Sequence, residues 1–245
     1  MRILALSDVH SNLSALQAVF RAVQRKRIDL TVCLGDLVGY GAQPNQVLER
    51  LRRRRGAKSF VRGNHDRVAL GGDLSGFNQV AREAALWTRS KLSPENRRFL
   101  AGLPHGPLVV HGVTLVHGSA LDEDEYLFTA AAARRSFEVI ATPIAMFGHT
   151  HLPTLFRLGE DGSVDGAVFS RDAEVRLEPG SRYLLNPGSV GQPRDRNPEA
   201  AFAIVDLARL SVRFRRVAYD VSAAQRAIRK AGLPGILADR LAAGY

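Results

Sequence analysis

The chain has 245 residues, of which 45% are hydrophobic and 24% charged, so it can bury a sizeable core. Its single cysteine, Cys33, excludes an intrachain disulfide, and no segment reaches the length of a transmembrane helix. The net charge of +10 indicates an anionic partner, such as nucleic acid or a phosphate ester. However, lysine occurs at only four positions, and an arginine excess in an alanine-rich chain is equally typical of genome base composition. We therefore give the charge little weight as evidence for nucleic acid.

The first residues of the chain and its single cysteine indicate the cellular compartment in which we expect the protein. Only residues 3–6 are apolar before the polar Ser7, which is too short a stretch for a signal peptide. Cys33 lies in an apolar run, where a small buried side chain is a better interpretation than a reactive thiol. We expect a cytoplasmic protein without a membrane partner. Length alone allows one α/β domain or two small ones.

The first part of the chain alternates strands and helices. Three strands are predicted, each followed by polar residues: 2–6 before Asp8-Val9-His10, 31–34 before Gly35-Asp36, and 58–61 before Gly63-Asn64-His65-Asp66. One helix begins after a cap at Ser11 or Asn12, and a second covers 45–54. The arginine run 52–55 is interpreted as the cationic, solvated end of that second helix. Ligands bind at the carboxyl ends of strands in open α/β sheets, so we expect the site at this edge.

The alternation lapses over residues 68–107. A glycine-containing stretch at 71–76 precedes one helix marked by Val80, Ala84 and Trp87, and another helix starts at Pro94. We predict a helical insertion here, and two arrangements remain open. The insertion leans over the cleft as a cap that selects the substrate, or it packs on the flank of the sheet.

Strands dominate the remainder of the chain. A hairpin is predicted around His111-Gly112, and its second arm ends at His117. A helix over 129–141 leads to a strand at 144–147 that ends in Gly148-His149-Thr150-His151. Short strands follow at 154–158, 164–169, 174–177, 183–186, 201–205 and 212–217, before a helix capped by Asp220 and a final short helix. Repeats, low-complexity tracts and linkers are absent, so residues 1–245 are predicted to form one domain with two sheets.

The histidines are concentrated at strand ends. Five of the seven occupy such positions beside Gly, Asp or Asn: His10, His65, His117, His149 and His151. Histidines needed for packing would be scattered, whereas this clustering is typical of metal ligation. Imidazoles with carboxylates, one amide and no thiolate suit Mn, Fe, Zn, Co or Ni better than Ca or Mg.

These residues form five motifs in order: Asp8-x-His10, Gly35-Asp36, Gly63-Asn64-His65-Asp66, His117 and Gly148-His149-x-His151. With them the chain resembles the calcineurin-like metallophosphoesterases. The resemblance implies an α/β sandwich in which two mixed sheets pack face to face between helices, a four-layer αββα fold. It also implies two divalent metal ions, of which manganese is the expected one, bridged by Asp36. One ion would be held by Asp8, His10, Asp36 and His151, and the other by Asp36, Asn64, His117 and His149.

The remaining motifs are similar to the small bacterial phosphodiesterase-like branch of that family. They are Gly35-Asp36-Leu37-Val38-Gly39-Tyr40-Gly41, the extension of the histidine motif to Leu152-Pro153, and the stretch from Asn186 to Arg194. The resemblance covers nearly the whole chain and is least informative over 68–107. Arg196 replaces a glycine that is common after the Pro-Arg-Asp stretch, which changes the charge at the rim and leaves the metal ligands unaffected.

The expected chemistry is hydrolysis by a hydroxide that two cations share while they clamp the phosphoryl oxygens. The resemblance makes His65 a catalytic residue that protonates the departing oxygen or hydrogen-bonds the phosphoryl group. Asp66 is interpreted either as a second catalytic residue that orients this ring or as a turn residue. Asn64, Arg194 and Tyr40 are candidates for substrate contact, although Arg194 also fits a solvated loop and Tyr40 a loop-filling role.

Three functions are weighed. The leading one is a phosphodiesterase that acts on a small phosphodiester such as a nucleotide. The alternative is a phosphomonoesterase, either a protein phosphatase or a dinucleoside polyphosphate hydrolase. A non-catalytic metal-binding scaffold is disfavoured because every ligand and His65 are intact. A groove lined by Arg82, Arg89 and Arg98 would instead favour polynucleotides, and the oligomeric state stays open.

Overall fold

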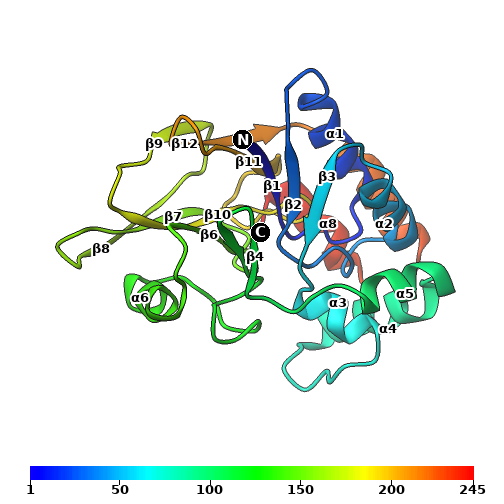
Figure 1. Ribbon diagram of the computed structural model, residues 1–245. Helices are drawn as coiled ribbons and strands as arrows, with labels where there is room; N and C mark the ends of the chain where they lie inside the picture. Colours follow the sequence, from blue (N-terminus) through cyan, green and yellow to red (C-terminus); the bar gives the residue numbers. More distant parts are fainter.

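Two six-stranded mixed sheets lie at the centre of the computed structural model, which describes residues 1–245 (Figure 1). The first sheet has the order β3 (Ala57–Phe60), β2 (Leu30–Cys33), β1 (Arg2–Leu6), β11 (Ala200–Asp206), β12 (Ser211–Val217) and β9 (Ala173–Arg176). The second has the order β4 (Leu108–Val110), β5 (Val113–Leu115), β6 (Ile144–Met146), β10 (Arg182–Pro187), β7 (Pro153–Leu158) and β8 (Val164–Val168).

Strand direction brings the polar strand ends together. In the first sheet β1, β2 and β3 are parallel, and in the second sheet β5, β6 and β10 are parallel. The carboxyl ends of parallel strands meet at one edge, so Asp8, Asp36 and Asn64 approach each other from the first sheet. His117 and His149 follow β5 and β6 in the same way from the second sheet. Both sets meet where the two sheets adjoin.

Three apolar clusters separate the layers. Side chains such as Val32 and Leu34 meet Leu115 and Leu185 in the cluster between the two sheets. The outer face of the first sheet packs against α1 (Leu13–Ala22) and α2 (Pro44–Arg52). The outer face of the second packs against α6 (Ala130–Val139). The four-layer sandwich of two mixed sheets between helices is therefore confirmed.

Two helices begin at predicted capping residues: Asn12 caps α1 by accepting a hydrogen bond from the amide of Ala15, and Asp220 caps α7 (Val221–Lys230). Thr129, which was not predicted as a cap, caps α6. The last helix, α8 (Gly235–Ala243), packs against α7 in a separate apolar cluster. None of the helices is both long enough and apolar enough to span a membrane.

The two predicted arrangements each describe one part of the segment 68–107: its helices pack on the flank of the sheet, and the stretch before them borders the site. Helices α4 (Gln79–Lys91) and α5 (Pro94–Ala101) pack on the flank beside α2, below α1 in Figure 1. The short helix α3 (Asn64–Ala69) precedes them, and the stretch between α3 and α4 borders the site described below. The guanidinium groups of Arg82 and Arg89 donate to the carbonyl oxygens of Leu74 at 3.3 Å and Val68 at 2.6 Å.

Candidate dinuclear metal centre

The residues at the strand ends have an unusual backbone conformation. Five non-glycine residues of the site have left-handed φ angles: Asp8 at 51°, His10 at 47°, Asp36 at 52°, His149 at 65° and His151 at 62°. Such conformations cost free energy and persist where the surrounding structure enforces them, which is typical of functional sites. Here main-chain bonds between neighbouring strand ends enforce them. The amide of Asp8 donates to the carbonyl of Gly35 at 3.1 Å, and that of His10 donates to Asp36 at 2.9 Å.

One cluster of donor atoms is formed by Asp8, His10, Asp36 and His151, whose candidate ligand atoms all lie within 4.8 Å of one another. The Nε2 atoms of the two histidines face each other at 3.1 Å. Oδ1 of Asp8 lies 3.5 Å from Nε2 of His151, and Oδ2 of Asp36 lies 3.6 Å from Nε2 of His10. All four side chains are buried.

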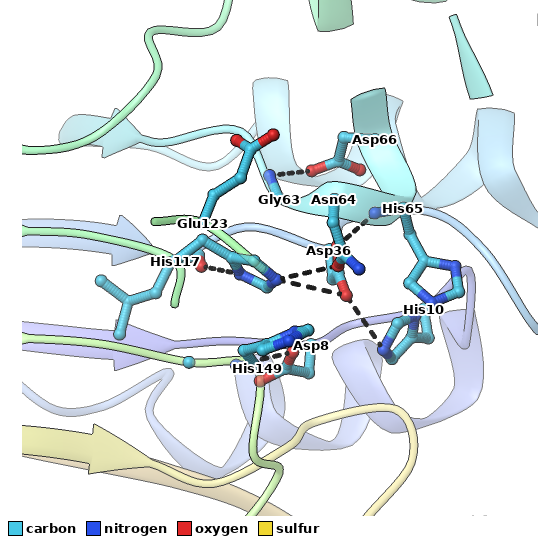
Figure 2. Close-up of polar contacts among 12 residues, drawn as sticks. Asp8, His10, Asp36, Gly63, Asn64, His65, Asp66, His117, Glu123 and His149 are labelled. Carbon is cyan, nitrogen blue, oxygen red and sulfur yellow. Dashed lines mark hydrogen bonds and ion pairs between the residues drawn. The ribbon is translucent and has the colours of Figure 1, made fainter. Parts of the chain in front are cut away.

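A second cluster shares Asp36 with the first. It contains Asp36, His117 and His149, again with ligand atoms within 4.8 Å. Oδ2 of Asp36 lies 3.5 Å from Nε2 of His117, and Oδ1 of Asn64 lies 3.2 Å from the same nitrogen. Figure 2 shows the Asp36 carboxylate between the rings of His10 and His117. The structure thus brings together all seven predicted metal ligands in two groups joined by one carboxylate.

Backbone carbonyls orient three of the imidazoles. Nδ1 of His10 bonds the carbonyl of Val38 at 3.1 Å, Nδ1 of His117 bonds Leu34 at 2.7 Å, and Nδ1 of His151 bonds Gln192 at 2.5 Å. A carbonyl only accepts hydrogen bonds, so each Nδ1 carries the proton and donates it. In the neutral rings Nε2 then presents a lone pair to the cluster, which is the arrangement of metal-binding histidines.

The charges of the first cluster suit a cation. Burial lowers the pKa of His10 and of His151 well below the usual value, so both rings are neutral. Two lone pairs then face each other across 3.1 Å with no proton between them. Burial also raises the pKa of Asp8 to about 7, and its Oδ2 has no hydrogen-bond partner. A divalent ion would satisfy these atoms together, so the donor set fits a metal.

The electrostatics of the second cluster also favour a positive charge beside Asp36. Burial alone would lower the pKa of His117, but the charge of Asp36 and a hydrogen bond to it outweigh burial and raise the pKa to about 10. Burial and the nearby charge of His117 lower the pKa of His149 to about 3. A proton on His117 thus supplies the positive charge that a metal ion would supply to Asp36. Oxygen and imidazole nitrogen donors without thiolate fit Mn, Fe, Zn, Co or Ni.

His65 lies beside both clusters without belonging to either. Its amide donates to Oδ1 of Asp36 at 2.9 Å, which fixes the residue at the start of α3. Its ring stands edge-on to that of His10 at 4.9 Å and to that of Phe77 at 4.8 Å. The ring makes no hydrogen bond within the protein, and its Nδ1 is buried. Its position next to the clusters leaves the ring available to a substrate.

Two glycines allow these close approaches. A Cβ on Gly63 would lie 2.9 Å from Cγ of Asp36, so only glycine lets the third strand end beside the bridging carboxylate. Gly39 has a φ of 95°, and a Cβ there would lie 2.6 Å from Nδ1 of His65. Glycine at these two positions therefore sets where Asp36 and His65 can sit.

The expectation that Asp66 orients the His65 ring is wrong. Its carboxylate instead accepts a hydrogen bond from the amide of Gly63 at 3.0 Å (Figure 2). It also accepts from the amides of Val38 at 3.0 Å and Leu37 at 3.3 Å. Burial and the charge of Asp36 raise the pKa of Asp66 to about 7, against the effect of these donors. Asp66 therefore joins the loop after the second strand to the start of α3, which is the predicted turn role.

Tyr40 is not placed to stack on a substrate base. Its side chain is buried, and its ring lies 4.3 Å from that of His65 and 4.7 Å from that of His10. The guanidinium of Arg240, from α8, lies over the ring at 4.4 Å. Tyr40 thus packs behind the two histidines, in agreement with the loop-filling alternative.

Arg194 is half-buried near the clusters. Burial is the main cause that lowers the pKa of His10, His65, His149 and His151, and the positive charge of Arg194 adds to it. Its guanidinium donates to Oε1 of Gln192 at 3.4 Å and also interacts with the Tyr126 hydroxyl, which leaves further donors free for an anion.

A cleft of about 460 Å³ opens beside the second cluster, and Asn64 and His149 form its floor. Phe77 lies in one wall and Tyr126 in the other. The Tyr126 ring stacks on His149 at 3.9 Å and on Phe128 at 5.2 Å, with interplanar angles of 19° and 6°. Both aromatic side chains are substantially exposed. A stack of rings therefore runs from a candidate metal ligand to the surface.

Several of these residues were not identified from the sequence. Arg67 lines the cleft and pairs with Glu123 at 2.6 Å and Asp124 at 2.9 Å, and the carbonyl of Asp124 bonds Nε2 of His149. Nε2 of His105 lies 3.3 Å from Oε2 of Glu123. The only local signal was the density of acidic and aromatic residues at 122–128 in a predicted loop.

Comparisons with known proteins agree with this geometry. The chain is similar to a metallophosphoesterase of known structure from Sphaerobacter thermophilus, with 40% identity and a TM-score of 0.87 over 100% of this chain and 99% of the other. It is 36% identical to an uncharacterized protein of Methanocaldococcus jannaschii over 99% of this chain and 98% of that protein. A hypothetical protein of Pyrococcus horikoshii OT3 shares the fold at 21% identity, with a TM-score of 0.81 over 100% of this chain and 98% of the other. The sequence profile of the calcineurin-like phosphoesterase superfamily domain matches residues 1–209. The chain therefore belongs to the calcineurin-like phosphoesterase superfamily.

Proposed function

We propose that the protein is a phosphodiesterase that hydrolyses a small phosphodiester, such as a nucleotide, with two manganese ions. Membership of the family supports hydrolysis of phosphoesters. The observation that carries the proposal is the pair of donor clusters joined by Asp36, with the free ring of His65 beside them and a cleft next to them. Divalent ions bound there would polarise a phosphoryl group and lower the pKa of a water molecule.

Separate residues of the chain would bind the ions, donate a hydrogen bond or a proton to the substrate, and attract its phosphate. Asp8, His10, Asp36 and His151 would hold one ion, and Asp36, Asn64, His117 and His149 the other. The His65 ring, which has no partner within the protein, would donate a hydrogen bond or a proton to an oxygen of the substrate. Arg194 would attract the phosphate with its free donors. Asp66 and Tyr40 would act indirectly. Asp66 holds the backbone that precedes His65, and Tyr40 packs against the His65 ring.

The walls of the cleft favour a diester over a monoester. A monoester is a dianion near neutral pH, whereas a diester carries one negative charge. The guanidinium of Arg67 is already paired with Glu123 and Asp124, and Asp73 also lines the cleft, so the walls supply little net positive charge. The exposed rings of Tyr126 and Phe128 suit a planar organic group, and a diester carries two organic groups.

The proposal is tested by hydrolysis with metal-stripped protein to which Mn²⁺ is returned. The panel contains an aryl phosphodiester and its paired monoester, cyclic nucleotides and dinucleoside polyphosphates. A higher kcat/KM for the diesters supports the proposal. Preference for the monoester, or for dinucleoside polyphosphates, would replace it with the corresponding alternative. No turnover with any divalent metal, despite two bound ions, would indicate a scaffold.

A further inference from the structure

The edge of the first sheet opposite the metal centre carries a dense group of basic side chains. The amino ends of β1, β2 and β3 lie at this edge, together with the carboxyl ends of α1 and α2. In Figure 1 it is the upper edge, near the amino terminus, and α3 marks the site side below. None of the candidate metal ligands reaches it, so its chemistry is independent of the proposed function.

Part of this edge is a hollow without acidic residues. A depression of about 510 Å³ is lined by ten residues, of which six are basic: Arg21, Lys26, Arg50, Arg53, Arg54 and Arg55. A second depression, of about 250 Å³, shares Lys26 with the first and adds Arg25, Arg27 and Arg215. A third, of about 530 Å³, shares Ser211 and Arg213 with the second. Each of these two includes one acidic residue, Asp206 and Glu174 respectively. Neighbouring depressions share lining residues, and we name the three together the basic groove.

Local ion pairs leave much of this charge free. Arg2 pairs with Asp206, Arg27 with Asp29, Arg213 with Glu174, Arg215 with Asp172, and Arg53 with Glu49 at 3.9 Å. In contrast, Arg21, Arg25, Arg50 and Arg55 make no ion pair within the protein. Exposed pairs of this kind contribute little and are readily exchanged for another anion. The groove therefore keeps an excess of unneutralised positive charge.

Two of the guanidinium groups are held close together. Those of Arg50 and Arg54 lie over the same ring, Phe20, at 4.7 and 4.5 Å from its centroid. Each group gains a cation–π contact with the ring, but repulsion between the two groups opposes this arrangement, and no carboxylate lines the hollow to offset it. Helix dipoles stabilise basic residues in the last turns of α1 and α2, but Arg25, Arg27 and Arg55 lie outside the helices. A ligand with closely spaced negative charges would explain the arrangement.

The shape and composition of the groove favour a nucleic-acid strand over a membrane. It crosses a sheet of six strands, or about 24 Å at ~4.8 Å per strand spacing. That length spans about seven phosphates of a stacked strand at ~3.4 Å each. Guanidinium forks match phosphate oxygens, and arginine provides nearly all of the charge. A membrane-binding surface would also be lined by exposed large apolar side chains for insertion, whereas the apolar lining residues Phe20, Val23, Ile28 and Ile204 are buried or half-buried. Met1 and Leu210, next in sequence to lining residues, are only 39% and 37% exposed.

We propose that the basic groove binds single-stranded nucleic acid through its phosphates, on the edge of the molecule opposite the metal centre. Binding through the backbone carries little sequence preference. The arginine run 52–55 is then only partly a solvated helix end. Arg52 pairs with Glu95 on α5, whereas Arg53, Arg54 and Arg55 face the groove.

The test is titration of a fluorescein-labelled 12-nucleotide oligouridylate by fluorescence anisotropy at several salt concentrations. The test variant is Arg25→Ser with Arg55→Ser, both exposed and unpaired. The matched control is Arg134→Ser with Lys230→Ser, exposed residues on α6 and α7 that remove the same charge. We expect the test variant to bind about tenfold or more weakly at 50 mM salt, with a salt slope shallower by about 1.4. The control should bind like the wild type, and all three proteins should hydrolyse an aryl phosphodiester equally.

Three results would overturn the inference. They are absence of binding at 50 mM salt, equal weakening in both variants, and binding of anionic phosphatidylserine vesicles or polyglutamate at least as tight as binding of the oligonucleotide. Equal weakening would mean that only the net charge matters. Preference for vesicles or polyglutamate would assign the groove to a membrane or to an acidic protein instead. None of these results bears on the hydrolytic activity, so the two proposals fail separately.

Discussion

His10 and His151 face each other with their Nε2 atoms 3.1 Å apart, although they are separated by 141 residues in the chain. Each ring is fixed from behind by a backbone carbonyl, of Val38 and Gln192 respectively. Two neutral imidazoles in this arrangement present lone pairs to each other, which is unfavourable unless a cation lies between them. The fold thus builds the first cluster before any ion is bound, and metal binding should stabilise it.

Replacement of Asp36 should therefore affect both ions, whereas replacement of His151 should affect one. We expect two Mn²⁺ per chain in the wild type, one in His151→Ala, and a loss of both in Asp36→Ala, because only Asp36 belongs to both clusters. Metal content after dialysis, measured by mass spectrometry, gives the stoichiometry. Chelation should also lower the melting temperature, since an ion at 100 times its Kd contributes about 2.7 kcal/mol to stability.

Asp165→Ala, on the exposed face of β8, is the control for the metal prediction and should keep two ions. If Asp36→Ala retained two ions while still folded, the shared-carboxylate arrangement would be wrong.

Replacement of His65 should separate catalysis from metal binding. Because the ring belongs to neither cluster, we expect His65→Ala to keep two ions and its stability while turnover falls by about 10²–10⁴-fold. The measurement is kcat on an aryl phosphodiester alongside metal content. His111→Asn, in an exposed turn at positive φ, is the control and should leave kcat unchanged. An unaltered kcat in His65→Ala would remove this residue from the catalytic machinery.

The sequence predicted that the candidate ligands converge, because their positions are local features. Each follows an apolar strand directly, and the carboxyl ends of parallel strands necessarily meet at one edge. The capping residues Asn12 and Asp220 are likewise signals read over three or four residues. The fold class followed from the same motifs through their resemblance to the family.

What the sequence could not show depends on contacts between distant segments. The carbonyls of Leu34, Val38 and Gln192 orient the imidazoles, but every residue has a carbonyl, so no side-chain pattern marks them. β10 lies between β6 and β7, an order that chain succession does not reveal. Asp66 neighbours His65 in sequence, yet its carboxylate points to the amides of Leu37 and Val38 because α3 begins at Asn64 and turns successive side chains to different sides.

Gly39 should be intolerant of a side chain. Its φ of 95° is unfavourable for alanine, and the added Cβ would press on Nδ1 of His65 at 2.6 Å. We expect Gly39→Ala to lose about 1–3 kcal/mol of stability and to reduce kcat, because the ring must move. Urea unfolding and diester hydrolysis measure the two effects. Gly76→Ala, where a Cβ would meet nothing within 4 Å, is the matched control. Full activity in Gly39→Ala would show that the His65 position is not critical.

Asp66→Asn should destabilise the protein without changing its metal content. The carboxylate accepts three backbone hydrogen bonds, and the amide would turn its NH₂ group toward at least one of these donors. We expect a loss of about 1–3 kcal/mol in the free energy of unfolding, measured with urea at pH 7. Activity should fall only as far as α3 shifts. If stability were unchanged and kcat dropped as in His65→Ala, Asp66 would have a direct catalytic role.

The aromatic stack beside the cleft predicts how the enzyme treats the organic part of its substrate. Phe128 is 57% exposed and stacks on Tyr126, which in turn covers His149, so Phe128 can be changed without touching a metal ligand. We expect Phe128→Ala to raise KM for thymidine 5′-p-nitrophenyl phosphate by about 5- to 150-fold, since stacking of a base on an aromatic ring contributes roughly 1–3 kcal/mol.

The comparison substrate is methyl p-nitrophenyl phosphate, which has the same leaving group and lacks the nucleoside. Its KM should be the same in Phe128→Ala and in the wild type. Leu121→Ala, also 57% exposed and in the same loop, controls for the loss of an apolar surface side chain. If Phe128→Ala changed both substrates equally, or neither, the stack would have no part in recognising a base, and a nucleotide would lose its main support as the substrate.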